Sequence, residues 1–163
     1  MIEELKYLLL GLIQGLAEFF PISSSGHLVL FSDLIDLAHE HPLLLSIVVH
    51  FATTLSTILI YNKRIFKITK GLISKNQQSI SFVGKIIVST LPIIIVGFLL
   101  RDKIEFIFDN STRLVAIMLT ITGLILLFTR QKKLSKKDIT YVDALLMGLA
   151  QSVAIIPGIS RSG

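Results

Sequence analysis

The chain has 163 residues, of which 52% are hydrophobic and 17% charged, and its mean hydropathy of +0.77 is well above that of soluble domains, so we expect a membrane protein. It contains no cysteine, which excludes disulfide frameworks, thiolate metal sites and cysteine nucleophiles. The net charge of +5 does not indicate nucleic acid, because the basic residues gather in two short loops between apolar runs, where membrane orientation explains them.

Residues 1–42 are predicted to form a re-entrant helix–loop–helix hairpin followed by an outer loop. The chain begins without a basic leader or a small-residue cleavage site, so we expect its first apolar stretch to be retained. Pro21 disfavours helix at the residue before it, and the serines and glycine of 23–26 suit a turn and a new helix start. Such a hairpin survives at membrane depth only when it is buried in protein or lines a wet cavity.

Three apolar runs follow, 43–61, 82–100 and 114–128, and each is long enough to cross a bilayer with some tilt or thinning. The loop after the third run is strongly basic, with Asp138 as its one acidic residue, and the segment between the second and third runs is balanced in charge. The loop after the first run has no acidic residue and five basic ones: Lys63, Arg64, Lys67, Lys70 and Lys75. The two basic loops are therefore predicted to be cytoplasmic, and the balanced segment to face outward.

The two ends of the chain resemble each other. Gln14 precedes Ser23 by nine residues, Gln151 precedes Ser160 by nine, and a proline stands just before the serines in both copies. Because three spans separate the copies, the repeat must be inverted in the membrane, so 139–163 is predicted to start a second re-entrant hairpin. The expected fold is an all-α polytopic helix bundle with inverted-topology repeats and two re-entrant hairpins that face each other.

The first copy carries an acidic residue and a cluster of hydroxyls. Glu18 shares a helix face with Gln14, and an ionisable residue in a membrane segment favours a function over the alternative, a buried hydrogen bond. The hydroxyls and backbone amides of residues 23–26 lie at a helix start, which favours an anion such as phosphate, although a plain N-cap explains one serine. The candidate phosphate-binding set is Ser23, Ser24, Ser25 and Gly26, and His27 adds a group that can accept or donate a proton near neutral pH.

The second copy adds Arg161 between Ser160 and Ser162, and we predict that all three bind phosphate. The guanidinium fork suits phosphate oxygens, and a salt bridge to Glu18 is the structural alternative. His50 lies within the first span, where a hydrogen bond to a neighbouring helix is at least as good an explanation as a place in the cavity, so it is left out of the catalytic set. His39 and His41 are interpreted as part of the outer loop rather than as metal ligands.

Residues 14–27, QGLAEFFPISSSGH, and 157–163, PGISRSG, resemble the two signatures of the undecaprenyl-pyrophosphate phosphatases of the bacitracin-resistance type. This resemblance implies hydrolysis of the lipid carrier's pyrophosphate to the monophosphate recycled in peptidoglycan synthesis, a divalent cation, Mg²⁺ or else Ca²⁺, and bacitracin resistance. It also implies a multi-pass protein of the bacterial inner membrane with its active site open to the periplasmic side, in contact with membrane lipid, and it leaves a homodimer open.

By the same resemblance, Glu18 matches the acidic residue of the first signature, Ser24 the nucleophile, His27 its acid–base partner and Arg161 the phosphate-binding arginine. Direct attack by water is equally compatible with these residues. Gln14 stands where glutamate is often found, so it offers a metal only a neutral carbonyl oxygen, and Glu18 is expected to carry more of the charge.

A transporter or flippase of a phosphorylated polyprenyl lipid is the alternative function, because inverted re-entrant repeats are common in transporters and fold alone does not separate the two. Release of inorganic phosphate in detergent would distinguish them, since transport requires a sealed membrane. The chain stops at Gly163 inside the second signature, so we expect a fragment that lacks three later spans and is inactive by itself.

Overall fold

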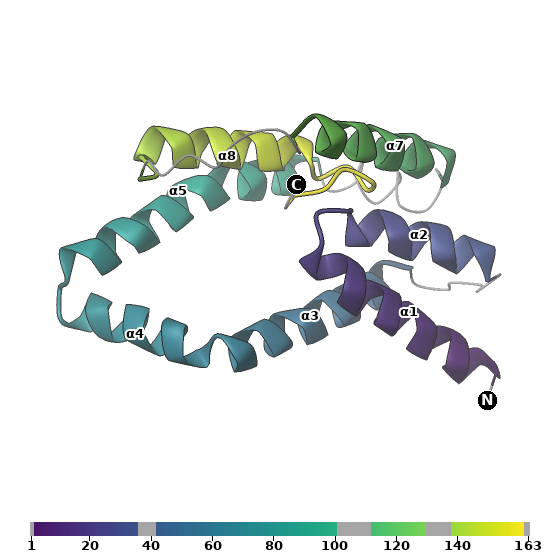
Figure 1. Cartoon of the computed structure of the whole chain (residues 1–163), viewed down its shortest axis with the longest axis horizontal. Coiled ribbons are helices and arrows are strands. Elements are labelled where there is room, and N and C mark those ends of the chain that lie inside the picture. Colours follow the sequence, from purple (N-terminus) through teal and green to yellow (C-terminus); the bar gives the residue numbers. More distant parts are fainter. Residues whose placement is uncertain (1, 36–41, 101–111, 130–137, 162–163) are drawn as a thin grey trace.

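The computed structural model describes residues 2–35, 42–100, 112–129 and 138–161, and within these ranges it contains helices and no strand (Figure 1). The all-α fold class predicted from the sequence is confirmed. The helices are α1 (Ile2–Phe19), α2 (Ser24–Leu34), α3 (Pro42–Ile60), α4 (Asn62–Ile73), α5 (Gln77–Leu99), α7 (Thr112–Thr129) and α8 (Tyr141–Val153).

Two of these helices, α5 and α7, are long and apolar enough to cross a membrane. The α3–α4 pair counts as a third span only if both helices are taken together, and it is bent by 76°. Helix α5 begins five residues before the predicted run 82–100 because Asn76 caps it, accepting from the backbone amides of Gln78 and Ser79. A hydropathy pattern detects the apolar part of such a helix and misses its polar first turn.

The basic segment after α3, which the sequence analysis treated as a loop, is the helix α4. It contains Lys63, Arg64, Lys67 and Lys70, and the chain turns only after it, at Lys75, which has a φ of 55°. Lysine, arginine, isoleucine and phenylalanine are compatible with helix, and the segment has no proline. Its apolar residues recur with helical spacing, a signal that the count of charges had obscured.

Helices α1 and α2 form a hairpin that packs side by side, with α3 against α1 and α7 against α2 (Figure 1). At its centre the buried side chains of Leu10 and Leu28 contact each other. Phe31, Leu45 and Val49 cover this pair from α2 and α3. Apolar packing therefore brings the end of α1, the start of α2 and the middle of α3 together. Whether the hairpin is re-entrant in a membrane stays a prediction.

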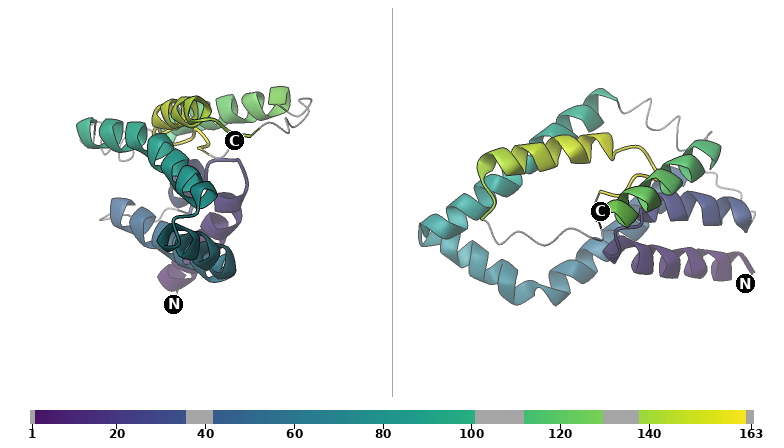
Figure 2. Two further views of the ribbon diagram at one scale, coloured as in Figure 1. Left: turned by 90° about the vertical axis from the view of Figure 1, so that its left-hand side faces the viewer. Right: turned by 45° about the horizontal axis from the view of Figure 1, so that its top comes forward.

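The closest helix pair is α5 with α8, which lies along it in both views of Figure 2. Gly148 allows the two helices to lie this close, because a Cβ at its position would be 2.3 Å from the backbone oxygen of Ser89. Helix α8 starts at a capping box in which the Thr140 hydroxyl accepts from the amide of Asp143 and the Asp143 carboxylate accepts from the amide of Thr140. The helix ends at Val153, and the segment with Arg161 follows it.

Much of the surface of these helices is apolar. Large side chains such as Phe98, Leu99, Phe128 and Val153 are well exposed on α5, α7 and α8. Surface of this composition is stable against lipid or against further protein rather than water. The chain is thus an all-helical membrane protein.

Replacing Gly148 with alanine should force α5 and α8 apart, because the new methyl group would overlap the Ser89 carbonyl. We expect Gly148→Ala to lower the free energy of unfolding of the purified protein by about 1–3 kcal/mol. Gly123→Ala on α7 is the matched control, since nothing lies within 4 Å of its Cβ position, and it should leave stability unchanged or raise it. Denaturant titration in detergent, followed by circular dichroism, measures both, and equal effects would contradict the packing described.

Candidate active site

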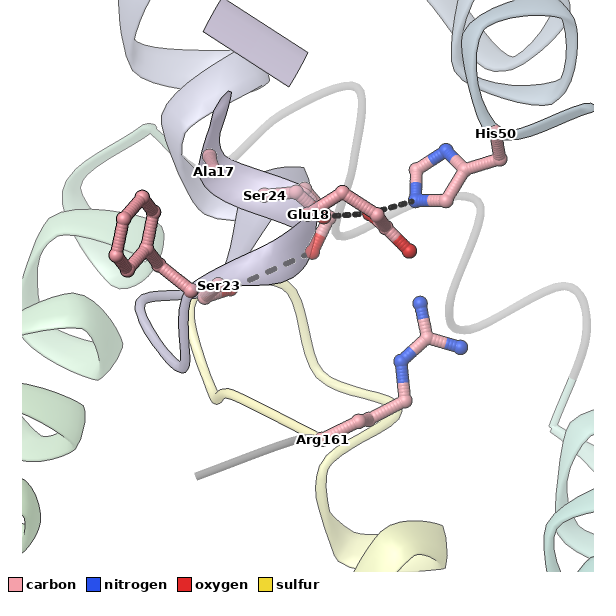
Figure 3. A pocket seen from close by; sticks show the side chains of 8 residues that line it. Ala17, Glu18, Ser23, Ser24, His50 and Arg161 are labelled. Atoms are coloured by element: carbon pink, nitrogen blue, oxygen red, sulfur yellow. Dashed lines mark hydrogen bonds and ion pairs between the residues drawn. The ribbon is translucent and has the colours of Figure 1, made fainter. Parts of the chain in front are cut away.

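A cavity of about 160 Å³ lies where the α1–α2 turn, the middle of α3 and the loop after α8 converge (Figure 3). It is small and largely polar at its base, which suits a phosphate group. Its lining consists of Ala17, Glu18, Phe20, Ser23, Ser24, Ser25, His50 and Arg161. The structure therefore brings the two sequence motifs, more than a hundred residues apart, to one cavity.

Glu18 is the centre of the hydrogen-bond network in this cavity. Its Oε2 accepts from the Ser24 hydroxyl at 2.5 Å and from the Gln14 amide nitrogen at 2.8 Å. Gln14 is fully buried on α1, one helical turn before Glu18. A carboxylate in an apolar environment requires such donors. The short hydrogen bond from the Ser24 hydroxyl also places the carboxylate where it can accept the serine proton.

His50, which the sequence left between a place in the cavity and a hydrogen bond to a neighbouring helix, lines the cavity and faces Glu18 of α1. Its Nε2 lies 3.6 Å from the Glu18 Oε2, and its Nδ1 lies 2.7 Å from the backbone oxygen of Ser46 in its own helix. Because a carbonyl oxygen only accepts, Nδ1 must donate. In the neutral ring Nε2 then carries a lone pair and no hydrogen, and in the protonated ring Nε2 donates toward Glu18. Nε2 is buried without a hydrogen-bond partner.

The three serines of the first motif divide their roles. Ser23 is the N-cap of α2: it has a left-handed backbone with φ 64°, and its Oγ accepts from the amide of Gly26 at 3.4 Å. The capping interpretation thus holds for this one serine. Ser24 bonds to Glu18, and the Ser25 hydroxyl lies 3.5 Å from that of Ser23. Two hydroxyls therefore remain at the cavity beyond what capping requires.

The loop after α8 is held by Thr122 of α7. The buried Thr122 hydroxyl donates to the backbone oxygen of Gly158 at 2.8 Å and accepts from the amide of Ser160 at 3.1 Å. Gly158 has a φ of 99°, and a Cβ at Gly26 would lie 2.8 Å from its Cα. The two motif loops touch at these glycines, so Gly26 lies at this contact and, with Ser160, outside the lining of the cavity.

Arg161 extends from this loop into the cavity, toward Glu18 and His50 (Figure 3). Among the described residues Arg161 forms no ion pair with Glu18, whose Oε2 instead lies 3.6 Å from the His50 Nε2. The salt bridge considered as an alternative is therefore absent, and the guanidinium is open to an anion. Ser162, the other predicted phosphate ligand, lies outside the described residues.

His27 is turned away from Ser24. Its Nδ1 lies 2.9 Å from the backbone oxygen of Ser23, and its ring stacks on Phe31 with centroids 6.4 Å apart. It lines a different, more open cavity with side chains of α7 that include Leu119 and Thr122. Hydrogen bonding and stacking within α2 thus direct the ring to α7, and the expected Ser24–His27 pair is not formed.

The described residues contain no cluster of three or more histidine or carboxylate side chains that would hold a metal. Glu18 provides a carboxylate at the cavity. Gln14 donates its amide nitrogen to that carboxylate, and its Oε1 is buried without a partner. The Glu18 carboxylate fits Mg²⁺ when the substrate's phosphate oxygens supply further ligands, whereas Gln14 does not line the cavity. His39 and His41 lie outside the described residues.

Comparison with known proteins gives consistent matches over nearly the whole chain. The family model of the bacitracin resistance protein BacA matches residues 7–163. A relative from Christiangramia forsetii named undecaprenyl-diphosphatase is 42% identical, over 96% of this chain and 60% of the relative. A relative of the same name from Bacteroides fragilis strain YCH46 is 44% identical, over 99% of this chain and 61% of the relative. A third, from Thermosipho africanus, is 44% identical, over 98% of this chain and 64% of the relative. The chain thus spans about three-fifths of their length.

Thr122→Val removes both hydrogen bonds to the Arg161 loop while preserving the shape of the side chain. Loss of a bond worth about 1 kcal/mol should speed amide hydrogen exchange at Ser160 roughly fivefold. Thr120→Val is the matched control, because the Thr120 hydroxyl bonds only to Ala116 of its own helix. Hydrogen–deuterium exchange with mass spectrometry measures the loop peptide, and unchanged exchange in Thr122→Val would show that Thr122 does not hold the loop.

Proposed function

The chain belongs to the BacA family of bacitracin resistance proteins, and on this premise we propose that the whole protein hydrolyses undecaprenyl pyrophosphate to undecaprenyl phosphate and inorganic phosphate. The observation that carries the proposal is the hydrogen bond from Ser24 to Glu18 in a cavity that Arg161 enters. It pairs a nucleophile with a base beside a cation that binds phosphate. The names of the relatives agree with this chemistry.

Substrate binding rests on Arg161 and the start of α2. The guanidinium fork bonds two oxygens of the terminal phosphate, and the partial positive charge at the amino end of α2 attracts the same group. Ser25 supplies a hydroxyl at the cavity. The prenyl chain remains in the lipid, which fits a cavity formed by membrane helices.

The chemical step begins with the Ser24 hydroxyl. Its oxygen attacks the terminal phosphorus, its proton passes to the Glu18 Oε2, and the bond between that phosphorus and the bridging oxygen breaks. Undecaprenyl phosphate leaves and takes up a proton, and water then cleaves the phosphoserine. Arg161 stabilises the charge on the transferring phosphoryl oxygens. Direct attack by water with Glu18 as the base uses the same groups.

The two histidines have different supports. His50 faces Glu18 and is proposed to orient it and to stabilise its charge when protonated. His27 is retained as a proton-transfer residue on the family resemblance. With its Nδ1 donating to the Ser23 backbone oxygen, Nε2 is the nitrogen left to exchange a proton.

We propose that Glu18 with Gln14 would hold a divalent cation, Mg²⁺ in the first place. When bound, it would neutralise negative charge on the pyrophosphate. This proposal rests on the Glu18 carboxylate in the cavity, and Gln14 is included on the family resemblance.

The proposed location is the bacterial inner membrane with the site open to the periplasmic side, where hydrolysis recycles the carrier for peptidoglycan synthesis and opposes bacitracin. The basic residues of α4 support this orientation, because basic segments next to spans favour the cytoplasmic side. A transporter of a phosphorylated lipid would need Arg161 but not a serine bonded to a carboxylate. No observation favours that alternative.

In the full-length protein, Ser24→Ala and Glu18→Gln should each lower phosphate release in detergent by about a thousandfold or more, because they remove the nucleophile and its base. Arg161→Lys keeps the positive charge but loses the two-pronged guanidinium, and it should lower phosphate release about a hundredfold. Ser32→Ala is the control, since the Ser32 hydroxyl bonds only to Leu28 of its own helix. Normal turnover in Ser24→Ala would exclude the serine mechanism, and normal turnover in all three variants would exclude the site.

His50→Gln should lower kcat about tenfold with little change in KM, because His50 contacts Glu18 rather than the bound phosphate. The pH dependence of kcat should also change, since an ionisable neighbour of the base is removed. Ser56→Ala on the same helix is the control, because the Ser56 hydroxyl donates to the backbone oxygen of Ala52 and does not contact His50. A kinetic profile of His50→Gln equal to that of Ser56→Ala would show that His50 has only a structural role.

A further inference from the structure

Helix α4 separates charge and apolar surface more sharply than its neighbours. At about 100° per residue, Lys63, Arg64, Lys67 and Lys70 fall within an arc of roughly 120°, and the apolar residues occupy the opposite side. No acidic residue occurs between Glu40 and Asp102. The basic face therefore lacks acidic neighbours along the chain, and no ion pair with another described residue neutralises it.

The apolar face of α4 is largely uncovered. The side chains of Phe66 and Ile73 are 71% and 81% exposed, and Ile65 is 41% exposed. Helix α4 contacts α5 near its carboxyl end, where Gly71 lies against Ser79, and it contacts α3 at their junction. It has no fully buried residue. Packing within the described residues therefore does not account for this face.

The bend between α3 and α4 sets the direction of the α4 axis relative to the membrane. We take α3 as the part of this bent pair that spans the membrane, because its 19 residues make about 28 Å of helix, close to the thickness of the hydrocarbon core. The first polar residues after it, Asn62 to Arg64, would thus reach the headgroups. The axis then turns by 76°, so a helix that continues from a span runs along the membrane surface instead of through it. In Figure 1, α4 lies at the end of this arm, away from α1, α2 and α7.

We infer that α4 is an interfacial helix that binds the anionic phospholipids of one leaflet. Its apolar face enters the acyl region, and its four basic side chains extend to the phosphate groups. Charge complementarity selects anionic headgroups as the partner. This inference depends on the membrane class of the protein and not on its proposed hydrolase activity.

These 163 residues contain no cysteine, so once any cysteine in the rest of the full-length protein is replaced by serine, each position can be labelled singly. Phe66→Cys and Ile73→Cys on the apolar face and Lys67→Cys on the basic face would carry a nitroxide in the full-length protein, reconstituted in vesicles of phosphatidylcholine and phosphatidylglycerol. The ratio of collisions with oxygen to collisions with a water-soluble nickel chelate should be about tenfold higher at 66 and 73 than at 67. Access of the chelate to position 66, or shielding of it from both reagents by protein, would overturn the inference.

A second measurement tests the lipid partner. The label at 66 should lie deeper in vesicles with phosphatidylglycerol than in pure phosphatidylcholine. Replacement of Lys63, Lys67 and Lys70 together by glutamine should abolish this difference, and replacement by arginine, the matched control, should preserve it. Equal depth in the two kinds of vesicle for the labelled parent protein would exclude anionic headgroups as the partner.

Discussion

A carboxylate held among membrane helices has to be satisfied by hydrogen-bond donors, and the site is built around this requirement. Glu18 lies at the end of α1 in an apolar segment, where an isolated charge would be costly. Gln14 and Ser24 donate to its Oε2, and His50 faces it from α3. The same bond that satisfies the carboxylate also orients the Ser24 hydroxyl. In the proposed mechanism, stability and reactivity therefore depend on one contact.

The second constraint is the irregular backbone of the two motif loops. Buried backbone groups outside regular helices need hydrogen-bond partners elsewhere in the protein. Gly26 and Gly158 allow the loops to touch, and Thr122 provides both a donor and an acceptor for the loop that carries Arg161. A larger residue at either glycine would separate Arg161 from Glu18. The cavity thus exists because two small residues and one hydroxyl permit the loops to meet.

The sequence was sufficient to predict which motifs form the site, but not how their side chains are directed. The matching spacing of the two copies predicted that Glu18, Ser24 and Arg161 would meet. The role of His50 depends on how α3 packs against α1, which no local pattern reports. His27 was assigned by resemblance, whereas its orientation follows from a hydrogen bond and a ring contact within α2. The inverted relation of the two copies stays a prediction.

Helix α4 shows a different limit. The positive charge of this segment predicts which side of the membrane it faces. The helical spacing of its apolar residues predicts the helix itself, which the charge alone does not. Both signals come from the same 12 residues, and they are compatible: a basic helix on the cytoplasmic surface satisfies the positive-inside rule. The predicted run 82–100 starts later than α5 for a related reason: the Asn76 cap and the first turn of the helix are polar, so hydropathy does not detect them.

The central claim is that Ser24, activated by Glu18, faces a phosphate held by Arg161. A structure of the full-length protein with a methylene-bridged pyrophosphate analogue tests it most directly. The account predicts the terminal phosphonate between the Arg161 guanidinium and the Ser24 hydroxyl, with Ser24 still bonded to Glu18. A phosphonate bound away from Ser24, or Arg161 paired with Glu18 in the occupied site, would contradict it.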